Sequence, residues 1–210
     1  MKQLFAQIES EFAVHKDGWC SLDKAHTLAA AILTMRPNLV VEIGIWAGRS
    51  LLPMALAMKQ IGKGKIVGLD PWKAEASVQG ITGEDLKWWA TVDHERVFND
   101  FNNWITQDAV GQFVEIHRCR SDEFDHKKMI TEKGLIDICH IDGNHGEAAS
   151  VYDVTHYAAN VRVGGFLYFD DLARAKKAAE MLPGMGFQML YIIDGGGMFQ
   201  RLNYEITNSK

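Results

Sequence analysis

The fold is decided by the stretch Leu39-Val40-Val41-Glu42-Ile43-Gly44-Ile45-Trp46-Ala47-Gly48-Arg49-Ser50, in which a buried strand, a glycine turn and the start of a helix follow one another. Its first five residues are apolar apart from one acid, which is typical of a strand in a parallel sheet that is covered on both faces. Helical spacing of apolar residues continues to Gln60, and Gly62-Lys63-Gly64 ends it. The next apolar run, Lys65–Leu69, predicts a strand that ends at Asp70. This order of elements opens a doubly wound α/β sheet.

The rest of the chain continues the alternation of helices and strands. Helices are predicted over residues 2–15, from Ser21 to about Met35, and over 94–105, 124–132, 147–160 and 174–182. Strands are predicted over residues 113–117, 135–141, 165–169, 187–193 and 198–202. The last two strands are joined around Gly195-Gly196-Gly197, which is a hairpin signal. We therefore predict a Rossmann-like α/β fold, with seven strands that are mostly parallel, the last strand antiparallel, and helices on both faces of the sheet.

The length of 210 residues fits one domain. Within it, residues 1–36 form N-terminal helices, residues 37–202 form the Rossmann-like core, and residues 71–92 are less regular and are a candidate insertion or lid on the substrate side. Ser21 is a good N-cap for the second helix, but Lys24 stands where a capping box has an acid.

Composition and charge restrict the class of partner. The formal net charge of -5, without a basic cluster, argues against nucleic acid as a partner. The first residues lack the apolar region of a signal peptide, and no apolar run approaches the roughly 20 residues that span a bilayer. The three cysteines are scattered and lack metal-binding spacing, which is typical of reduced thiols. We predict a cytoplasmic protein that does not bind a membrane.

Two of the predicted strands end in acids. The run over 135–141 leads into Asp142, with His145 three residues later, and the run over 165–169 leads into Asp170 and Asp171. Ligands of open α/β sheets bind beyond the carboxyl ends of the strands, so these side chains are expected at one edge. Hard oxygen ligands suit Mg²⁺, Ca²⁺ or Mn²⁺. The structural alternatives are that Asp171 caps the next helix and that His145 only packs at a helix start.

The glycine turn and Asp70 indicate a second ligand. Glycines let a backbone approach a ligand closely, and a helix N-terminus attracts an anion. In the dinucleotide fingerprint G-x-G-x-x-G, Trp46 occupies the place of the second glycine and would obstruct a pyrophosphate. A smaller anion, such as an amino-acid carboxylate, fits better, and an ordinary tight turn is the alternative. An acid at the end of the second strand commonly binds the hydroxyls of a ribose, although Asp70 before Pro71 is also a routine turn.

The pattern E-x-G-x-x-x-G-x-S followed by Asp70 resembles class I S-adenosylmethionine-dependent methyltransferases. Within this class the chain resembles the small metal-dependent O-methyltransferases, over roughly residues 18–202. The resemblance implies that Asp142, Asp170 and Asp171 hold a divalent cation, with Mg²⁺ the first choice, and that His145 is the general base. His145 and Asp171 depart from the catechol branch, which uses lysine and asparagine, and look more like the macrocin-type sugar branch. The absence of a clear acid in Gly195–Met198 also argues against a catechol substrate.

The same resemblance implies a set of residues that contact S-adenosylmethionine. Ser50 would bind the methionyl carboxylate, Glu42 would shape the floor near the methionyl group, and Ser121 would contact the adenine side. The complete predicted set is Glu42, Gly44, Trp46, Gly48, Ser50, Asp70, Ser121 and Asp142. Trp72 can line the same pocket, and Trp88 and Trp89 belong to a lid or to an oligomer contact.

These observations predict an enzyme that transfers a methyl group from S-adenosylmethionine, with a divalent cation, to a hydroxyl of a small molecule. A sugar or polyol is the preferred acceptor, and a homo-oligomer is compatible with the sequence. Three alternatives remain open: a metal-independent methyltransferase of the same fold, an NAD-dependent oxidoreductase, and a binding module without catalysis. Trp46 argues against the oxidoreductase, and an acid and histidine set beside a cofactor site argues against a pure binding module.

Overall fold

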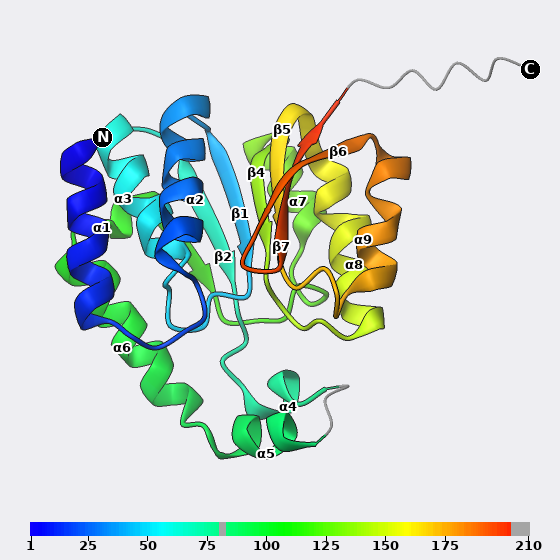
Figure 1. Cartoon of the computed structure of the whole chain (residues 1–210), viewed down its shortest axis with the longest axis horizontal. Coiled ribbons are helices and arrows are strands. Elements are labelled where there is room, and N and C mark those ends of the chain that lie inside the picture. The colour runs from blue at the N-terminus through cyan, green and yellow to red at the C-terminus, as the bar shows by residue number, and fades with distance from the viewer. Residues whose placement is uncertain (80–82, 203–210) are drawn as a thin grey trace, which may run out of the picture.

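The computed structural model of the chain describes residues 1–79 and 83–202 and has a seven-stranded sheet at its centre (Figure 1). The strand order is β3-β2-β1-β4-β5-β7-β6. The five parallel strands are β1 (Leu39–Ile43), β2 (Lys65–Leu69), β3 (Val114–His117), β4 (Ile136–Ile141) and β5 (Val161–Phe169). Strand β7 (Gly196–Arg201) is antiparallel to both of its neighbours, β5 and β6 (Phe187–Ile193). The sheet confirms the predicted Rossmann-like topology, including the antiparallel last strand.

Helices cover both faces of the sheet. The helices of one face are α1 (Lys2–Val14), α2 (Leu22–Met35), α3 (Leu51–Ile61) and α6 (His94–Gln107), and those of the other are α7 (His126–Lys133), α8 (Glu147–His156) and α9 (Lys176–Met181). Three short 3-10 helices lie at Gly111–Phe113, Ala158–Asn160 and Pro183–Met185. Among the described residues, no helix is long and apolar enough to cross a membrane.

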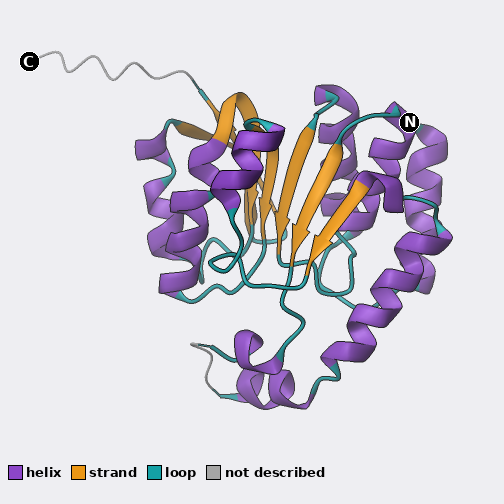
Figure 2. Cartoon of the chain, turned by 180° about the vertical axis from the view of Figure 1, so that it is seen from behind, coloured by secondary structure: helices purple, strands orange, loops and turns teal. Residues whose placement is uncertain are grey.

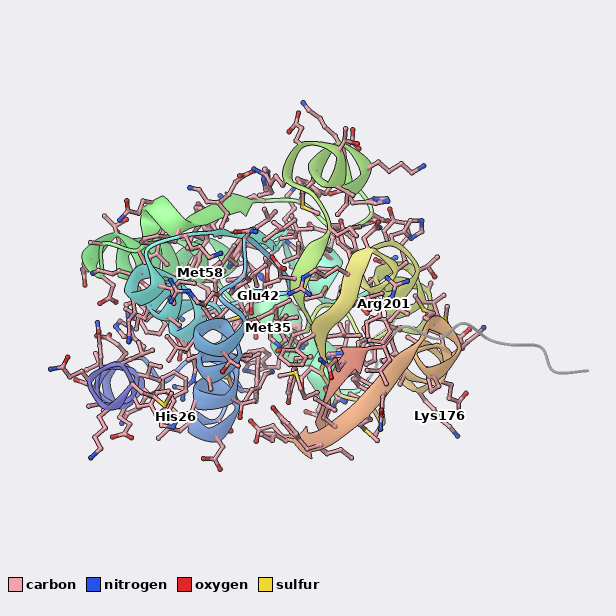
Figure 3. All side chains as sticks on the ribbon, turned by 90° about the horizontal axis from the view of Figure 1, so that it is seen from above. His26, Met35, Glu42, Met58, Lys176 and Arg201 are labelled. Carbon is pink, nitrogen blue, oxygen red and sulfur yellow. The ribbon has the colours of Figure 1, made fainter. Side chains whose placement is uncertain are left out.

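The two-residue period of the strands divides the core between the two faces. In β1, Val40 belongs to the core cluster that contains side chains of α1, α2 and α3, whereas Leu39 and Val41 belong to the cluster that contains side chains of α7, α8 and α9. All five residues of β1 are buried, and Glu42 is among them. Burial on both faces explains why the central strands are continuous apolar runs rather than alternating ones. Glu42 lies in the interior of the molecule and Lys176 at its outside (Figure 3).

The segment after β2 contains two helices instead of an irregular loop. Helices α4 (Ala74–Ser77) and α5 (Glu84–Thr91) lie beyond the sheet, and the arrowheads of the parallel strands point toward them (Figure 2). Residues 80–82 of the predicted insertion lie outside the described residues. Helices α4 and α5 thus lie at the ligand-binding edge that the α/β topology defines.

Two boundaries near the carboxyl terminus differ from prediction. Strand β5 begins at Val161 rather than at Gly165, because Val161 pairs with Ile136 and a register shift then absorbs the following residues. The predicted three-glycine turn is wrong. The turn is Asp194-Gly195, with φ of 53° and 76°, and the next two glycines begin β7. Two successive residues with a left-handed backbone conformation are typical of a two-residue hairpin turn, and aspartate tolerates this conformation.

Candidate active site

A cavity of about 940 Å³ lies at the carboxyl ends of the parallel strands. It brings together most residues that the sequence predicted to be functional. Glu42 and Gly48 of the cofactor set do not line it, and neither does Trp72, which is 2% exposed and packs on Phe98 and Phe101. The predicted residues on its wall are Gly44, Trp46, Ser50, Asp70, Ser121, Asp142, His145, Asp170 and Asp171. The cavity is therefore large enough, and polar enough at one end, for a cofactor and a small acceptor.

The glycine turn brings the ends of β1 and β4 into close contact. Gly44 has φ of 84°, and a Cβ atom placed on it would lie 2.0 Å from the backbone oxygen of Asp142. Gly48 has φ of 82°, and its Cβ would lie 2.5 Å from the ring of Phe101. Both positions thus need glycine for two reasons, the left-handed backbone and the space. Gly44 fixes the position of Asp142 relative to the turn, whereas Gly48 seats the turn against α6.

Asp70 accepts three backbone hydrogen bonds, two from the glycine turn and one from the segment that follows Asp70. Its Oδ2 accepts from the backbone N–H groups of Ile45 and Trp46, at 2.9 Å each, and its Oδ1 accepts from Trp72 N at 2.8 Å. Burial raises the pKa of Asp70, and these three hydrogen bonds oppose that rise. A carboxylate oxygen has two acceptor positions, so a ligand hydroxyl can still bind here. Asp70 shapes the turn in addition to the ribose contact that the sequence predicted.

A buried hydrogen-bonded chain runs behind the cavity. Ser50 Oγ donates to Glu42 Oε1 at 2.5 Å, and His140 Nδ1 lies 2.7 Å from the same oxygen. Burial, together with the charge of Lys24, lowers the pKa of His140, so its neutral ring donates to Glu42. The single hydroxyl proton of Ser50 is therefore committed to Glu42. To bind a methionyl carboxylate as predicted, Ser50 would have to turn its proton away from Glu42.

Lys24 lies between two of the three predicted metal ligands. Its Nζ donates to Asp142 Oδ2 at 3.0 Å and to Asp170 Oδ2 at 2.8 Å, and its side chain is 1% exposed. Burial alone would lower the pKa of Lys24. The two carboxylates raise this pKa by more than burial lowers it, so the ammonium stays charged. Burial and the nearby Asp170 raise the pKa of Asp142. Burial opposes ionisation of Asp170 as well, yet Lys24 keeps its pKa below the usual value. The ammonium thus compensates one of the two negative charges that the carboxyl groups carry when both are ionised.

The predicted metal site does not fit a divalent cation in this arrangement. Lys24 Nζ occupies the space between Asp142 and Asp170, and the third predicted ligand, Asp171, is paired with His145. Within residues 1–79 and 83–202, no group of three His, Cys, Asp or Glu side chains is placed to hold a metal ion. Metal binding therefore stays a prediction of the sequence, and no step of the chemistry below uses a metal.

His145 lies on the cavity wall beside Asp171. Its Nε2 is 3.2 Å from Asp171 Oδ2 and 4.0 Å from Asp142 Oδ1, and its side chain is 25% exposed. Burial lowers the pKa of His145, although Asp171 opposes this effect, so the imidazole is neutral near pH 7. In the tautomer with its proton on Nε2, the ring donates to Asp171 and its Nδ1 can accept a proton. This is the arrangement of a general base oriented by a carboxylate.

Four tryptophans, Trp19, Trp46, Trp88 and Trp89, form an aromatic wall of the cavity, and His94 packs behind them. The ring centroids of Trp46 and Trp89 are 4.9 Å apart, and those of Trp19 and Trp88 are 5.4 Å apart. His94 contacts Trp46 at 5.7 Å. All four tryptophans line the cavity, and Trp19 is 68% exposed. Residues 88 and 89 of the candidate lid thus meet the glycine turn through their rings.

Sequence reasoning missed four polar residues at this site. The capping-box pattern singles out Lys24 only as a missing acid, and His140 has no role in the sequence analysis beyond its place in the strand predicted over 135–141. Asp194 forms the hairpin turn, lines the cavity and accepts a hydrogen bond from Ser21 N at 3.0 Å. Asp153 lines the cavity from α8. The lysine at a capping position, where an acid is usual, could have drawn attention to Lys24. His140, Asp194 and Asp153 belong to no local sequence motif.

Asp153 predicts a pH-dependent stability. Burial raises its pKa from 3.8 to about 7, so the native state holds a proton that the unfolded state releases between about pH 4 and pH 7. The free energy of unfolding therefore falls as pH rises through this window. The shift corresponds to up to about 4 kcal/mol. We expect the Asp153→Asn variant to lose this dependence and to be more stable than the parent at pH 8.

Urea unfolding of parent and variant at intervals between pH 4 and pH 8 measures the difference. Asp100→Asn is the matched control, because Asp100 is exposed and pairs with Arg96 within α6. A difference curve for Asp153→Asn that is as flat as that of the control would contradict the buried, protonated state of this carboxyl.

Comparison with known protein families agrees with the fold and the cavity. A family profile described as a methyltransferase domain matches residues 41–172, which is more than half of the chain. The chain therefore belongs to this methyltransferase family, and its sheet is that of the class I S-adenosylmethionine-dependent methyltransferases. This confirms the predicted class of enzyme. A search of curated protein sequences finds no significant match.

Solved structures of several O-methyltransferases share the fold. The O-methyltransferase TomG from Streptomyces achromogenes, involved in tomaymycin synthesis and solved with S-adenosylmethionine, has a TM-score of 0.64 at 13% identity, covering 95% of this chain and 90% of TomG. An O-methyltransferase from Bacillus cereus, solved with S-adenosylhomocysteine, has a TM-score of 0.62 at 12% identity, with 96% and 91% covered. The O-methyltransferase NovP has a TM-score of 0.59 at 18% identity, with 89% and 84% covered.

Proposed function

We propose that this protein transfers the methyl group of S-adenosylmethionine to a hydroxyl of a small molecule. The observation that carries the proposal is the single cavity that joins the glycine turn and Asp70 at one end to His145 and Asp171 at the other. The similarity of the fold to O-methyltransferases solved with this cofactor or its product supports the choice of cofactor. The divalent cation expected from the sequence is not part of this proposal, because Lys24 lies between two of its ligands.

The cofactor would lie along the glycine turn. Trp46 and Asp70 would face its ribose and methionyl parts, and the backbone N–H groups at the start of α3 would attract the methionyl carboxylate. Ser121 lines the cavity and would contact the adenine side, and Tyr157 Oη, which donates to its backbone oxygen at 2.7 Å, fixes its position. Asp142 would approach the sulfonium, whose positive charge would favour the ionised form of this carboxyl group and oppose the rise of its pKa.

The chemistry at the acceptor end needs a base and an in-line approach. His145 would take the proton of the acceptor hydroxyl at Nδ1 as its oxygen attacks the methyl carbon, and the carbon–sulfur bond would break to leave S-adenosylhomocysteine. Asp171 would hold the imidazole in this tautomer and stabilise the imidazolium that forms. Alignment of the two reactants can contribute roughly 7–11 kcal/mol, more than the base alone. The residues that align the two reactants would therefore lower the activation barrier by more than the proton transfer to His145 does.

The acceptor would stack on the aromatic wall. Indole faces provide broad, flat apolar surfaces, and the carboxylates opposite can accept hydrogen bonds from hydroxyl groups. A sugar or polyol with an apolar ring face satisfies both surfaces, which supports the acceptor class preferred from the sequence. Residues 71–92 would act as the substrate-side insertion, held by Asn144 Nδ2, which donates to Gln79 O at 2.8 Å and to Ala76 O at 3.2 Å. The cytoplasmic location and the homo-oligomer stay predictions of the sequence.

The direct test is methyl transfer from isotopically labelled S-adenosylmethionine. The purified protein is incubated with a panel of small sugars, polyols and phenols, and with matched amines and thiols in which the hydroxyl is replaced. We expect label only in hydroxyl compounds, as a methyl ether identified by mass spectrometry. Transfer to the amines or thiols alone would contradict O-methylation, and transfer to phenols but no polyol would contradict the preferred acceptor class.

Trp88 provides a separate prediction for the acceptor. It is 45% exposed and contacts the rings of Trp19, Trp46 and Trp89. An aromatic contact of this kind contributes about 0.5–1.5 kcal/mol. We expect Trp88→Ala to raise the KM of the acceptor by roughly 2–10-fold with little change in kcat, and Trp88→Phe to stay close to the parent. An unchanged KM in Trp88→Ala would remove this wall from acceptor binding.

A further inference from the structure

We infer that Lys24 is the resident cation of this site and takes the place that a divalent metal ion was expected to hold between Asp142 and Asp170. The inference deepens the proposed function, because it concerns the same carboxylates. Lys24 is a positioning residue, since it is buried and does not line the cavity, whereas both of its carboxylate partners do. Its action on a bound acceptor would pass through Asp142 and Asp170.

The first argument is the way in which Lys24 is held. Ser21 Oγ accepts from Lys24 N at 3.1 Å and fixes the first turn of α2, which packs on α3. The ammonium lies 4.9 Å from the ring centroid of Tyr168, on β5, one residue before the end of the strand. Tyr168 is itself fixed by donating from Oη to Ile193 O at 2.5 Å. Three elements thus place Lys24 Nζ, which is a built position rather than a chance surface contact.

The second argument is charge. Lys24 brings one positive charge to two carboxylates that converge from the ends of β4 and β5, at distances of 3.0 and 2.8 Å. Two partly buried carboxylates that lie close together without a cation repel each other. The lysine supplies one positive charge from within the chain, which lowers the repulsion between the two carboxyl groups and allows them to lie together without a bound ion. A divalent cation would have to displace an ammonium that already satisfies the Oδ2 atoms of both.

The third argument is that Asp171, the third predicted metal ligand, is paired with His145. Asp171 has φ of 48°, and its Oδ2 lies 3.2 Å from His145 Nε2. The residue that would complete a three-carboxylate metal site is instead used to orient the base. Asp170 Oδ1 is buried and has no hydrogen-bond partner among the described residues, and it faces Gly196, where a Cβ atom would lie 2.7 Å away. The carboxylates are thus directed toward Lys24 and His145 separately, rather than toward one common point.

A titration with Mn²⁺ alone, followed by the electron paramagnetic resonance signal of the free ion, tests this inference without an acceptor. We expect the parent protein to have no site tighter than about 1 mM, the weak end of protein sites for hard cations. We expect Lys24→Ala to bind one Mn²⁺ at least about tenfold more tightly, because the removed ammonium leaves two converging carboxylates. Lys177→Ala is the matched control, since Lys177 pairs with Glu147 at the surface, and it should match the parent.

Thermal unfolding gives the second readout. Mn²⁺ at a hundredfold excess over its Kd should raise the Tm of Lys24→Ala by on the order of 5–10 °C and leave the parent unchanged. A stoichiometric micromolar Mn²⁺ site in the parent would overturn the inference, and this measurement holds even if Lys24→Ala does not fold. Equal, weak binding by the folded variant and the parent would also overturn it. Failure of the proposed function would be seen separately, as the absence of S-adenosylhomocysteine binding in the parent.

Discussion

Replacement of His145 by alanine is expected to reduce kcat by about 10²–10⁴-fold while S-adenosylmethionine still binds. The expectation follows from the position of the imidazole on the cavity wall, with Nε2 directed at Asp171 at 3.2 Å and a neutral ring near pH 7. The variant removes the proton acceptor and leaves the glycine turn and Asp70 in place. Initial rates at saturating cofactor, together with calorimetric titration of S-adenosylhomocysteine, separate the two effects.

His126→Ala is the matched control, because His126 lies at the start of α7 and does not line the cavity. It should retain the kcat of the parent. Turnover by His145→Ala that equals the parent value would remove His145 from the mechanism. Loss of cofactor binding together with turnover would instead assign His145 a role in forming the cofactor site.

Replacement of Gly44 by alanine is expected to destabilise the fold and to abolish cofactor binding in what remains folded. The new Cβ would lie 2.0 Å from the backbone oxygen of Asp142, and backbone cannot rotate away as a side chain does. The left-handed backbone costs about 1–2 kcal/mol for a residue with a Cβ atom. Forcing the ends of β1 and β4 apart costs roughly 1–3 kcal/mol more. Chemical denaturation measures the loss, and S-adenosylhomocysteine titration below the unfolding midpoint measures binding.

Gly62→Ala separates the two costs. Gly62 also has a left-handed backbone, with φ of 72°, but a Cβ atom there would meet nothing within 4 Å among the described residues. The free energy of unfolding of Gly62→Ala should fall by only about 1–2 kcal/mol, and this variant should bind the cofactor as the parent does. Equal losses in the two variants would show that backbone conformation alone explains the effect at Gly44, and that the contact with Asp142 is not needed.

The fold could be predicted because its strands are buried on both faces and read as apolar runs. The run at residues 39–43 and the run at 65–69 match β1 and β2 at both ends. The hairpin was located correctly but its turn was not, because three successive glycines conceal which two residues turn. Asp194 adopts φ of 53° because Gly196 is needed in β7, where a Cβ would lie 2.6 Å from Tyr168 Oη. Such a requirement comes from a neighbouring strand and leaves no local pattern.

The positions of the candidate site residues could be predicted from topology, but not their partners. Acids that end parallel strands must meet at one edge, and Asp142, Asp170 and Asp171 do so. Lys24 could not be placed in this way, because it is 118 residues from Asp142 and 146 from Asp170 and comes from a helix. Which helix side chain reaches a strand end depends on the packing of α2 against the sheet, and one sequence does not contain that information.

The most direct test of the central claim is a calorimetric titration of the parent protein with S-adenosylhomocysteine and, separately, with NAD⁺. The cavity, the glycine turn with Trp46 in place of a second glycine, and Asp70 predict one tightly bound S-adenosylhomocysteine per chain and no binding of NAD⁺. Binding of NAD⁺ without binding of S-adenosylhomocysteine would contradict the account.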